Sequence, residues 1–272
     1  MRAAVLFLLL IGCADAPPDA PARPERVVSL LPAWTAIIER LGCGDRLVAC
    51  SEYCEPSREL PRIDWRSARA AEQVARLDPD LVVKQLPRAP HDPLQSALAS
   101  LGLAVQSLPS ETVADVRAAI TGLADALGES ERGRALVATF DARLAAATAR
   151  VRSKPRPRVL FLYTRKAGAI ADVGAAGPNT FIDELITMAG GTNALAAADE
   201  PYVQLDQERL VRLEPDVIID VLPSEEDPAA VWRRARLTEA RIEFVRDNAL
   251  LIPGPDLPAS VETLAQLIHG DS

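Results

Sequence analysis

The residue types that bind transition metals or attack substrates are scarce in this chain. Its 272 residues include four cysteines, two histidines and two methionines. Cys43, Cys50 and Cys54 lie close together, but their spacing is not the C-x2-C of a zinc site and no histidine is near them. We expect all three to be small core side chains, although in an oxidising compartment one pair could form and leave one free thiol. The sequence therefore predicts no metal site.

Motifs of the common enzyme classes are also absent from the sequence. It has no G-x-S-x-G nucleophile elbow, no phosphate-binding P-loop, no G-x-G-x-x-G after a strand and no H-E-x-x-H zinc motif. His91 lies in the proline-bracketed stretch "RAPHDP" and His269 lies near the end of the chain, so a Ser-His-Asp triad would need chance geometry. We expect a binding protein rather than an enzyme.

The fourth cysteine, Cys13, follows a short apolar run. Arg2 supplies a positive start, and residues 3–11 form an apolar core too short to span a bilayer, which is the pattern of a secretory signal. Residues 10–13, "LIGC", resemble a bacterial lipobox, in which the cysteine after the cleavage site takes a lipid on its sulfur. We expect residues 1–12 to be a lipoprotein signal peptide and Cys13 to be lipidated. The alternative is an ordinary cleaved signal with a chance cysteine.

Residues 13–25 are rich in Pro and Ala, a composition typical of an extended, semi-rigid spacer. We therefore expect an exported protein, lipid-anchored through Cys13 to a bacterial membrane at its periplasmic face or at the cell surface. The folded part should begin near Arg26. The chain after the predicted signal peptide and tether is long enough for two modest lobes or one large α/β domain.

Composition and charge exclude some partners. Hydrophobic residues make up 49% of the chain, which supports a substantial core, and the formal net charge is −8. A nucleic-acid-binding protein would show a basic patch and a high isoelectric point, and an acidic chain is also a poor partner for anionic lipid. We expect no nucleic-acid partner.

An internal repeat is the most informative feature of the sequence. Residues 71–86, "AEQVARLDPDLVVKQL", and 207–222, "QERLVRLEPDVIIDVL", share a Glu, a Pro-Asp seven residues later and a β-branched run. In each copy a helix is stopped by the proline, Pro79 or Pro215, because proline cannot continue a helix and disfavours helical backbone before it. Asp80 then opens a short buried strand.

The elements before each repeat also correspond. Residues 26–42 predict a strand, a turn at Pro32 and a helix from Thr35 to Gly42. Residues 158–191 predict a strand, a longer turn and a helix from Thr180 to the paired glycines at its end. We expect two βαβ-type lobes, each with a parallel sheet and helices on its faces.

A helical segment separates the two lobes. Residues 111–152 are rich in Ala and Arg, with apolar residues at helical spacing. We expect two helices broken near Gly128. The second, within residues 129–154, should be a long and rigid connector between an N-terminal lobe at 26–128 and a C-terminal lobe at 155–272.

This organisation resembles the substrate-binding proteins of ABC importers, in the helical-backbone class that binds iron-siderophores, haem and vitamin B12. The resemblance covers about residues 25–270. The stretch "RVVSLLPAWTAIIERLGCGDRLVACSEYCEPSRELPRID", with its S-L-x-P-x-x-T turn, looks like the opening of the cobalamin-binding branch. The stretch "NTFIDELITMAGGTNAL" looks like the second-lobe helix and Gly-Gly turn of the family.

The resemblance implies two Rossmann-like α/β lobes with a ligand between them, lined by loops that follow the strands. That ligand is a corrinoid, a ferric-siderophore or haem, and no resident cofactor is expected. Aromatic residues at these loops suit a flat macrocycle. Carried over by position, the expected ligand-binding residues are Pro32, Ala33, Trp34, Thr35, Tyr53, Cys54, Trp65, Gln85, Tyr163, Arg165 and Tyr202.

Some of these residues have a second interpretation. Trp34 and Trp65 could instead pack in the core. Arg165 could pair with a carboxylate or phosphate of the ligand, or it could be a solvated surface charge.

The family further implies one acidic docking residue on each lobe, and Glu72 and Glu208 match those positions in the repeat. Their partner would be an ABC permease with its ATPase, and the binding protein itself would be a monomer. Alternatively, these glutamates only favour the dipole of the helix they begin.

Competing functions remain open at this stage. A receptor for zinc or manganese ions would need three or four His, Asp or Glu ligands, which two histidines make a poor fit. A sensor lipoprotein would bind the same ligand without a permease.

Overall fold

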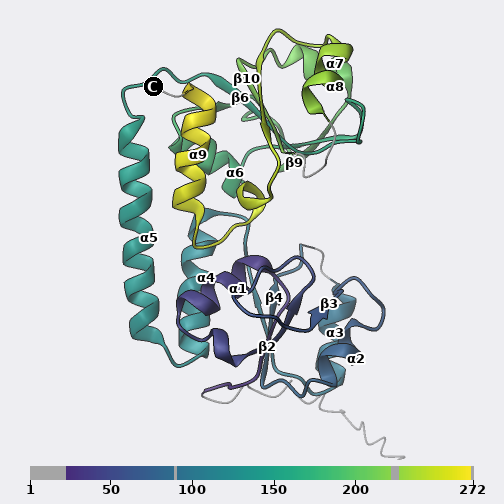
Figure 1. Cartoon of the computed structure of the whole chain (residues 1–272), viewed down its shortest axis with the longest axis vertical. Helices are drawn as coiled ribbons and strands as arrows, with labels where there is room; N and C mark the ends of the chain where they lie inside the picture. Colours follow the sequence, from purple (N-terminus) through teal and green to yellow (C-terminus); the bar gives the residue numbers. More distant parts are fainter. Residues whose placement is uncertain (1–22, 89–90, 222–226, 271–272) are drawn as a thin grey trace, which may run out of the picture.

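The computed structural model describes residues 23–88, 91–221 and 227–270. These residues form two α/β lobes, one above the other in Figure 1, with a long helix along one side. Cys13, the predicted signal peptide and most of the predicted tether lie outside the described residues. In the part of the chain that the structure describes, no helix combines the length and the apolar character needed to cross a membrane.

The N-terminal lobe contains a parallel sheet of five strands in the order β3-β2-β1-β4-β5. Its central strands are mostly apolar and buried, as expected where helices cover both faces of a sheet. The elements are β1 (Val27–Ser29), α1 (Pro32–Arg40), η1 (Gly44–Arg46), β2 (Leu47–Ser51), β3 (Arg62–Ile63), α2 (Ala70–Ala75), β4 (Leu81–Gln85), α3 (Pro93–Ser100) and β5 (Val105–Leu108).

Helix α1 begins at Pro32, three residues before the predicted start at Thr35. Proline suits the first turn because its fixed φ is helical and the N–H that it lacks would have no partner there. The predicted turn is therefore already the first turn of the helix.

The C-terminal lobe contains a six-stranded sheet, in which the path β11-β10-β6-β7-β9 is joined by β8 alongside β6. The predicted parallel pairing is present, since β10 runs parallel to β11 and β6, and β8 runs parallel to β6. The exception is β7, which runs antiparallel to both β6 and β9. Only residues 165–172 link β6 to β7, too few for a crossover helix, so the chain turns back as a hairpin. The elements are β6 (Arg158–Thr164), β7 (Val173–Ala176), α6 (Phe181–Met188), β8 (Thr192–Asn193), β9 (Tyr202–Leu205), α7 (Gln207–Arg212), β10 (Val217–Val221), α8 (Pro228–Ala235), β11 (Arg241–Val245), η2 (Ala249–Leu251) and α9 (Leu257–His269).

The repeated Pro-Asp turn makes the same contacts in both lobes. The Asp80 carboxylate accepts hydrogen bonds from the backbone N–H of Arg26, at 2.9 Å, at the start of β1. The Asp216 carboxylate accepts from the N–H of Arg158, at 2.7 Å, at the start of β6. The repeat therefore marks the place where a helix ends and the next strand joins the sheet.

The predicted helical connector is present. Helix α4 (Val113–Ala126) begins with a capping box between Thr112 and Asp115, and α5 (Ser130–Arg150) follows after Gly128, which has a positive φ of 71°. Helix α5 packs against α4 and against α9, and thus against both lobes (Figure 1). It ends at Arg150, before the predicted limit at residue 154, and turns complete the link to the next strand.

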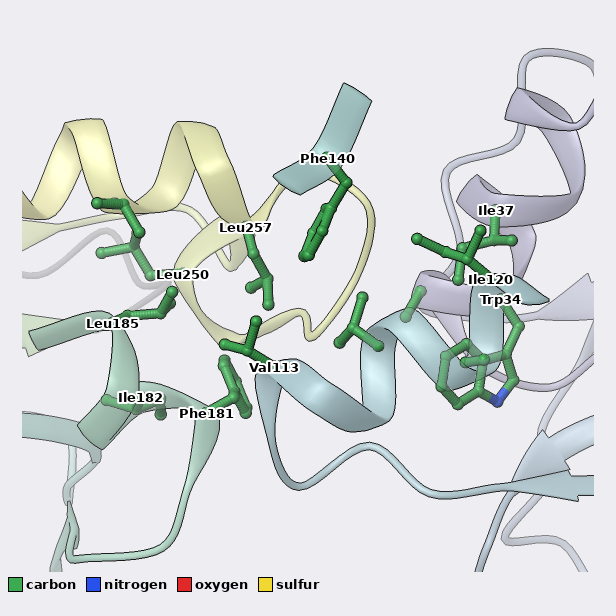
Figure 2. Packing of buried hydrophobic residues seen from close by; sticks show 14 of the residues in the cluster. Trp34, Ile37, Val113, Ile120, Phe140, Phe181, Ile182, Leu185, Leu250 and Leu257 are labelled. Carbon is green, nitrogen blue, oxygen red and sulfur yellow. The ribbon is translucent and has the colours of Figure 1, made fainter. Parts of the chain in front are cut away.

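One apolar cluster runs through both lobes. Figure 2 shows Trp34 and Ile37 of α1 and Ile120 of α4 at one end, and Phe181 and Leu185 of α6 at the other. Phe140 of α5, Val113 of α4 and Leu257 of α9 lie between these groups (Figure 2). The lobes are thus joined by a continuous hydrophobic core as well as by the connecting helix.

Substitutions of Trp34 test its place in this core. Its side chain has no exposed surface, and its buried indole N–H has no hydrogen-bond partner. Trp34→Ala should therefore lower the free energy of unfolding by about 3–5 kcal/mol, through lost burial and a cavity. Trp34→Phe should cost roughly 1–2 kcal/mol, because it retains most of the apolar surface and removes the unpaired donor.

Urea denaturation of the purified protein measures both losses. The matched control is Trp65→Ala, which removes an exposed indole and should change stability by less than about 0.5 kcal/mol. Equal losses in Trp34→Ala and Trp65→Ala would contradict the assignment of Trp34 to the core.

Candidate functional site

The candidate site lies at the carboxyl edge of the N-terminal sheet. Because its strands are parallel, the loops that follow β1, β3 and β4 meet at this edge, where open α/β sheets bind ligands. A pocket of about 470 Å³ opens between them. Its walls are mostly apolar and are formed by Leu30, Leu31, Trp65, Ala71, Leu86, Pro87, Pro93, Leu94 and Ala97, together with the polar residues Arg66, Ser67, Lys84, Gln85, Arg88 and Asp92.

A buried ion pair lines this pocket. The Lys84 ammonium lies 2.5 Å from an Asp92 carboxylate oxygen, and both side chains are largely shielded from solvent. Burial by itself would raise the pKa of Asp92, but hydrogen bonds from Lys84 and from the first-turn amides of α3 lower it below its usual value. Asp92 thus remains ionised, caps α3 and fixes the lysine.

Exposed aromatic rings border the same pocket. Tyr53 is 50% exposed and Trp65 is 40% exposed, and the Arg66 guanidinium lies 4.9 Å from the centroid of each ring. Large exposed hydrophobic side chains are few among the described residues, and Leu86 at the end of β4 is a third one at this edge. A contiguous apolar and aromatic surface with a cationic border is typical of a ligand site rather than of ordinary surface.

A group of three residues, here named the interlobe clasp, connects this edge to the other lobe. The clasp consists of Arg88 and Glu111 from the N-terminal lobe and Tyr202 from the C-terminal lobe. Arg88 donates two hydrogen bonds to the Glu111 carboxylate, at 2.8 and 2.7 Å, and its guanidinium lies 4.1 Å from the centroid of the Tyr202 ring. The Tyr202 hydroxyl donates to Glu111 at 3.0 Å. The two lobes therefore meet through polar contacts beside the pocket.

Tyr163 adds an aromatic surface from the C-terminal lobe. It lies near the carboxyl end of β6, and its ring packs edge-to-face on Tyr202, with centroids 5.7 Å apart. Burial raises the pKa of Tyr163. The structure thus brings together Tyr53, Trp65, Gln85, Tyr163 and Tyr202 around the facing edges of the lobes. Pro32 is partly exposed at the start of α1.

Four of the expected ligand-binding residues lie in the interior instead. Ala33, Trp34, Thr35 and Cys54 are all buried in the N-terminal lobe. Trp34 lies in the first turn of α1 and points into the shared core, and the Thr35 hydroxyl donates to Ser29 at 2.8 Å. This corrects the prediction that they contact ligand. Because α1 starts at Pro32, the side chains of Ala33, Trp34 and Thr35 pack inward from its first turn. Cys54 lies in the turn after β2, where its sulfur meets the Thr35 hydroxyl at 3.2 Å.

The prediction for Arg165 is also corrected. The side chain is neither a solvated surface charge nor free to pair with a ligand. Its side chain is buried, and its Nε lies 2.9 Å from a carboxylate oxygen of Asp220 at the end of β10. The Trp232 indole donates to the same oxygen at 2.8 Å. Arg165 therefore links β6 to β10 inside the lobe.

Glu72 and Glu208 occupy equivalent exposed positions, on the first turns of α2 and α7. Their side chains are 64% and 78% exposed, and each faces an arginine one turn later, Arg76 or Arg212. Figure 1 shows α2 and α7 on the side of the molecule away from α5. The docking role of these glutamates stays a prediction.

Sequence reasoning missed Arg66, Arg88, Glu111 and the Lys84–Asp92 pair. For the Lys84–Asp92 pair the sequence did contain a signal. Lys84 interrupts an apolar strand, and Asp92 stands directly before a proline that begins a helix. The arginines carried no signal, because most charged residues in loops are solvated.

Comparisons with known proteins agree with this arrangement. Residues 27–250 match the family described as periplasmic binding protein. The chain belongs to this family. The vitamin B12-binding protein of Vibrio cholerae serotype O1 is 27% identical over 222 residues, which cover 79% of this chain and 78% of that protein. A Bacillus subtilis protein named as an uncharacterized ABC transporter substrate-binding lipoprotein, YvrC, is 25% identical over 265 residues, 92% of this chain and 81% of that protein.

A solved structure gives the same fold. The periplasmic heme-binding protein RhuT from Roseiflexus sp. RS-1, in its apo form, superposes with a TM-score of 0.73 at 28% identity, over 90% of this chain and 98% of that one. These relatives are named as binding proteins and not as enzymes, which confirms that expectation. Periplasmic binding proteins act outside the cytoplasm, so the expectation of an extracytoplasmic protein is confirmed at that level.

The interlobe clasp should shift the ionisation of Tyr202. Burial, reinforced by the Glu111 carboxylate, raises the pKa of Tyr202 from 10.0 to about 12. Because the folded protein then holds this proton more tightly than the unfolded chain, its stability is intact below pH 10 and falls as the pH rises toward 12.

Ultraviolet titration of the phenolates and denaturant unfolding at a series of pH values measure this effect. Tyr202→Phe should remove the high-pH ionisation and part of the stability loss, whereas Tyr53→Phe, a change at an exposed ring, should leave both in place. Wild-type behaviour in Tyr202→Phe would contradict the contacts assigned to the clasp.

Proposed function

We propose that this protein captures a corrinoid similar to vitamin B12 between its two lobes and delivers it to an ABC permease. The observation that carries the proposal is the aromatic and apolar surface around the pocket, at the edge where the lobes meet. A flat macrocycle gains most from such surfaces, because ring faces supply dispersion contacts and release water. The vitamin B12-binding relative supports a corrinoid as the cargo.

Haem is the second candidate, and a specific observation favours it. Arg66 and Arg88 both line the pocket, and both guanidinium groups remain partly exposed. Haem carries propionate carboxylates, which arginine binds in bidentate fashion, whereas the corrin edge of cyanocobalamin carries neutral amides. The 28% identity to RhuT supports this alternative.

Titration of residues 14–272 with cyanocobalamin and with haem tests the two candidates. In the wild type, tryptophan fluorescence should report binding through Trp65, because Trp34 and Trp232 are buried. Calorimetric heat measures affinity in every variant, including those that lack this tryptophan. Trp65→Ala should weaken binding of the true cargo about 30-fold, equivalent to about 2 kcal/mol. Leu101→Ala is the matched control, since it removes an exposed apolar side chain of the same lobe outside the pocket.

Arginine variants separate the cargoes. Arg66→Ala and Arg88→Ala should weaken haem binding by about tenfold or more and affect cyanocobalamin much less. Saturable binding of cyanocobalamin alone would establish the corrinoid. Binding of neither compound would contradict both candidates and direct the search to ferric-siderophores.

We propose further that Cys13 carries a lipid that anchors the protein to a bacterial membrane. The lipobox-like residues 10–13 and the lipoprotein relative YvrC support this anchor. The protein would act as a monomer tethered beside the permease.

Glu72 and Glu208 would contact arginines of that permease, one from each lobe. In a reconstituted importer, Glu72→Gln and Glu208→Gln should each lower transport by about tenfold while leaving cargo affinity unchanged. Glu131→Gln is the control, because this glutamate on α5 is also exposed and also pairs with an arginine one turn later, Arg134. Unimpaired transport in both variants, and in the double variant, would contradict the docking role and favour a sensor that binds cargo without a permease.

A further inference from the structure

Cys50 and Cys54 lie together in a buried cluster at the end of β2. Cys50 belongs to β2, and Cys54 closes the turn that follows, where its backbone N–H donates to the Ser51 carbonyl at 3.1 Å. Both side chains are almost completely buried. Arg62 contacts both residues, through the Cys50 sulfur and the Cys54 carbonyl oxygen. The two cysteines are therefore neighbours within one cluster, close enough for Cys54 to affect the pKa of Cys50.

Polar groups hold both thiols in place. The hydroxyls of Thr35 and Ser51 each lie 3.2 Å from the Cys54 sulfur. Arg62 donates to the Cys50 sulfur at 3.3 Å and to the Cys54 carbonyl oxygen, and thus spans the pair. Cys43 shares none of these partners, and its sulfur instead faces the Leu41 carbonyl.

We propose that Cys50 and Cys54 form a disulfide in the exported protein and that Cys43 remains the free thiol. Proteins of this family act outside the cytoplasm, in compartments where neighbouring cysteines form disulfides and the disulfides persist. This assigns the pairing among three cysteines that the sequence left open.

The oxidant is the disulfide of a thiol–disulfide oxidoreductase of the exported compartment. One cysteine thiolate attacks it, which forms a mixed disulfide and releases the first oxidoreductase thiolate. The second cysteine thiolate then attacks the protein sulfur of the mixed disulfide and releases the second oxidoreductase thiolate. The two cysteines lose two protons and two electrons in total, and the oxidoreductase disulfide becomes a dithiol.

The disulfide should form while the chain folds, before the two cysteines are buried, and not in the folded protein. Burial, together with the neighbouring Cys54, raises the pKa of Cys50 to about 11, although Arg62 acts in the opposite direction. Thiolate is therefore scarce once the cluster has closed, and the attacking sulfur is also inaccessible. The same burial shields the finished disulfide from external reductants.

The disulfide has a consequence for the ligand site. It closes a ring over residues 50–54, and this ring contains Tyr53, which meets Arg66 at the border of the pocket. The bond would thus restrict the loop that presents this aromatic ring.

Thiol trapping of the exported protein tests the pairing directly. Cells that export the full chain are quenched in acid, and the denatured protein is alkylated and digested with trypsin. Residues 47–58 form one tryptic peptide that contains both Cys50 and Cys54, and residues 41–46 form another that contains Cys43. We expect the first peptide without alkylation and lighter by two hydrogen atoms than its reduced form, and the second peptide alkylated. Alkylation at both Cys50 and Cys54, or a cross-link of either residue to Cys43, would overturn the proposal.

A second measurement uses matched variants. Reduction under mildly denaturing conditions should lower the Tm by a few degrees in the wild type and in Cys43→Ser. The Cys50→Ser, Cys54→Ser double variant should show no such shift. A shift of the same size in the double variant would overturn the proposal. Neither measurement uses bound ligand. The test of the disulfide is therefore independent of the proposed function.

Discussion

Hydrophobic packing between the two lobes is the interaction on which the rest of the structure depends. Helix α5 presents Phe140 to side chains from both lobes, and α6 and α9 extend the same apolar cluster into the C-terminal sheet. A hinge motion that separated the lobes would expose this cluster to water, and exposure of apolar surface is the largest single cost in protein unfolding. The lobes are therefore held as one body along the side that carries α5.

This constraint decides how a ligand can be captured. Because the connecting helix and the shared core fix one side, the lobes have little freedom to move relative to each other where they meet at the interlobe clasp. The conformational changes that accompany ligand binding should therefore occur in loops and side chains, such as Trp65, Arg66 and the interlobe clasp. The clasp is partly exposed and polar, so it can rearrange at much smaller cost than the core. Under the proposed docking role of the glutamates on α2 and α7, recognition by a permease would depend on small local changes near them.

Much of the fold could be predicted because its signals are local. The Pro-Asp repeat fixed the end of a helix and the start of a strand in each lobe, and Gly128 marked the break before the connecting helix. Hydrogen bonds of Asp80 and Asp216 explain why the repeated aspartate follows the proline. The hairpin between β6 and β7 was missed because buried strands look alike in parallel and antiparallel sheets, and only the length of their link distinguishes them.

The site was harder to predict because burial is a property of the whole fold. Trp34 and Trp65 are chemically identical, yet a helix that starts at Pro32 buries the first, whereas the loop after β3 exposes the second. Arg165 was mistaken for a surface or ligand-facing charge because its partner, Asp220, lies in a strand far along the chain. The clasp likewise unites residues from two loops and the start of β9, which no local pattern brings together.

The measurement that tests this account most directly is differential scanning calorimetry of residues 14–272 without ligand. If the shared core makes the lobes one cooperative unit, the protein should unfold in a single transition with equal calorimetric and van't Hoff enthalpies. Two separate transitions, or a calorimetric enthalpy about twice the van't Hoff value, would show that the lobes unfold independently and would contradict the central role of the core between them.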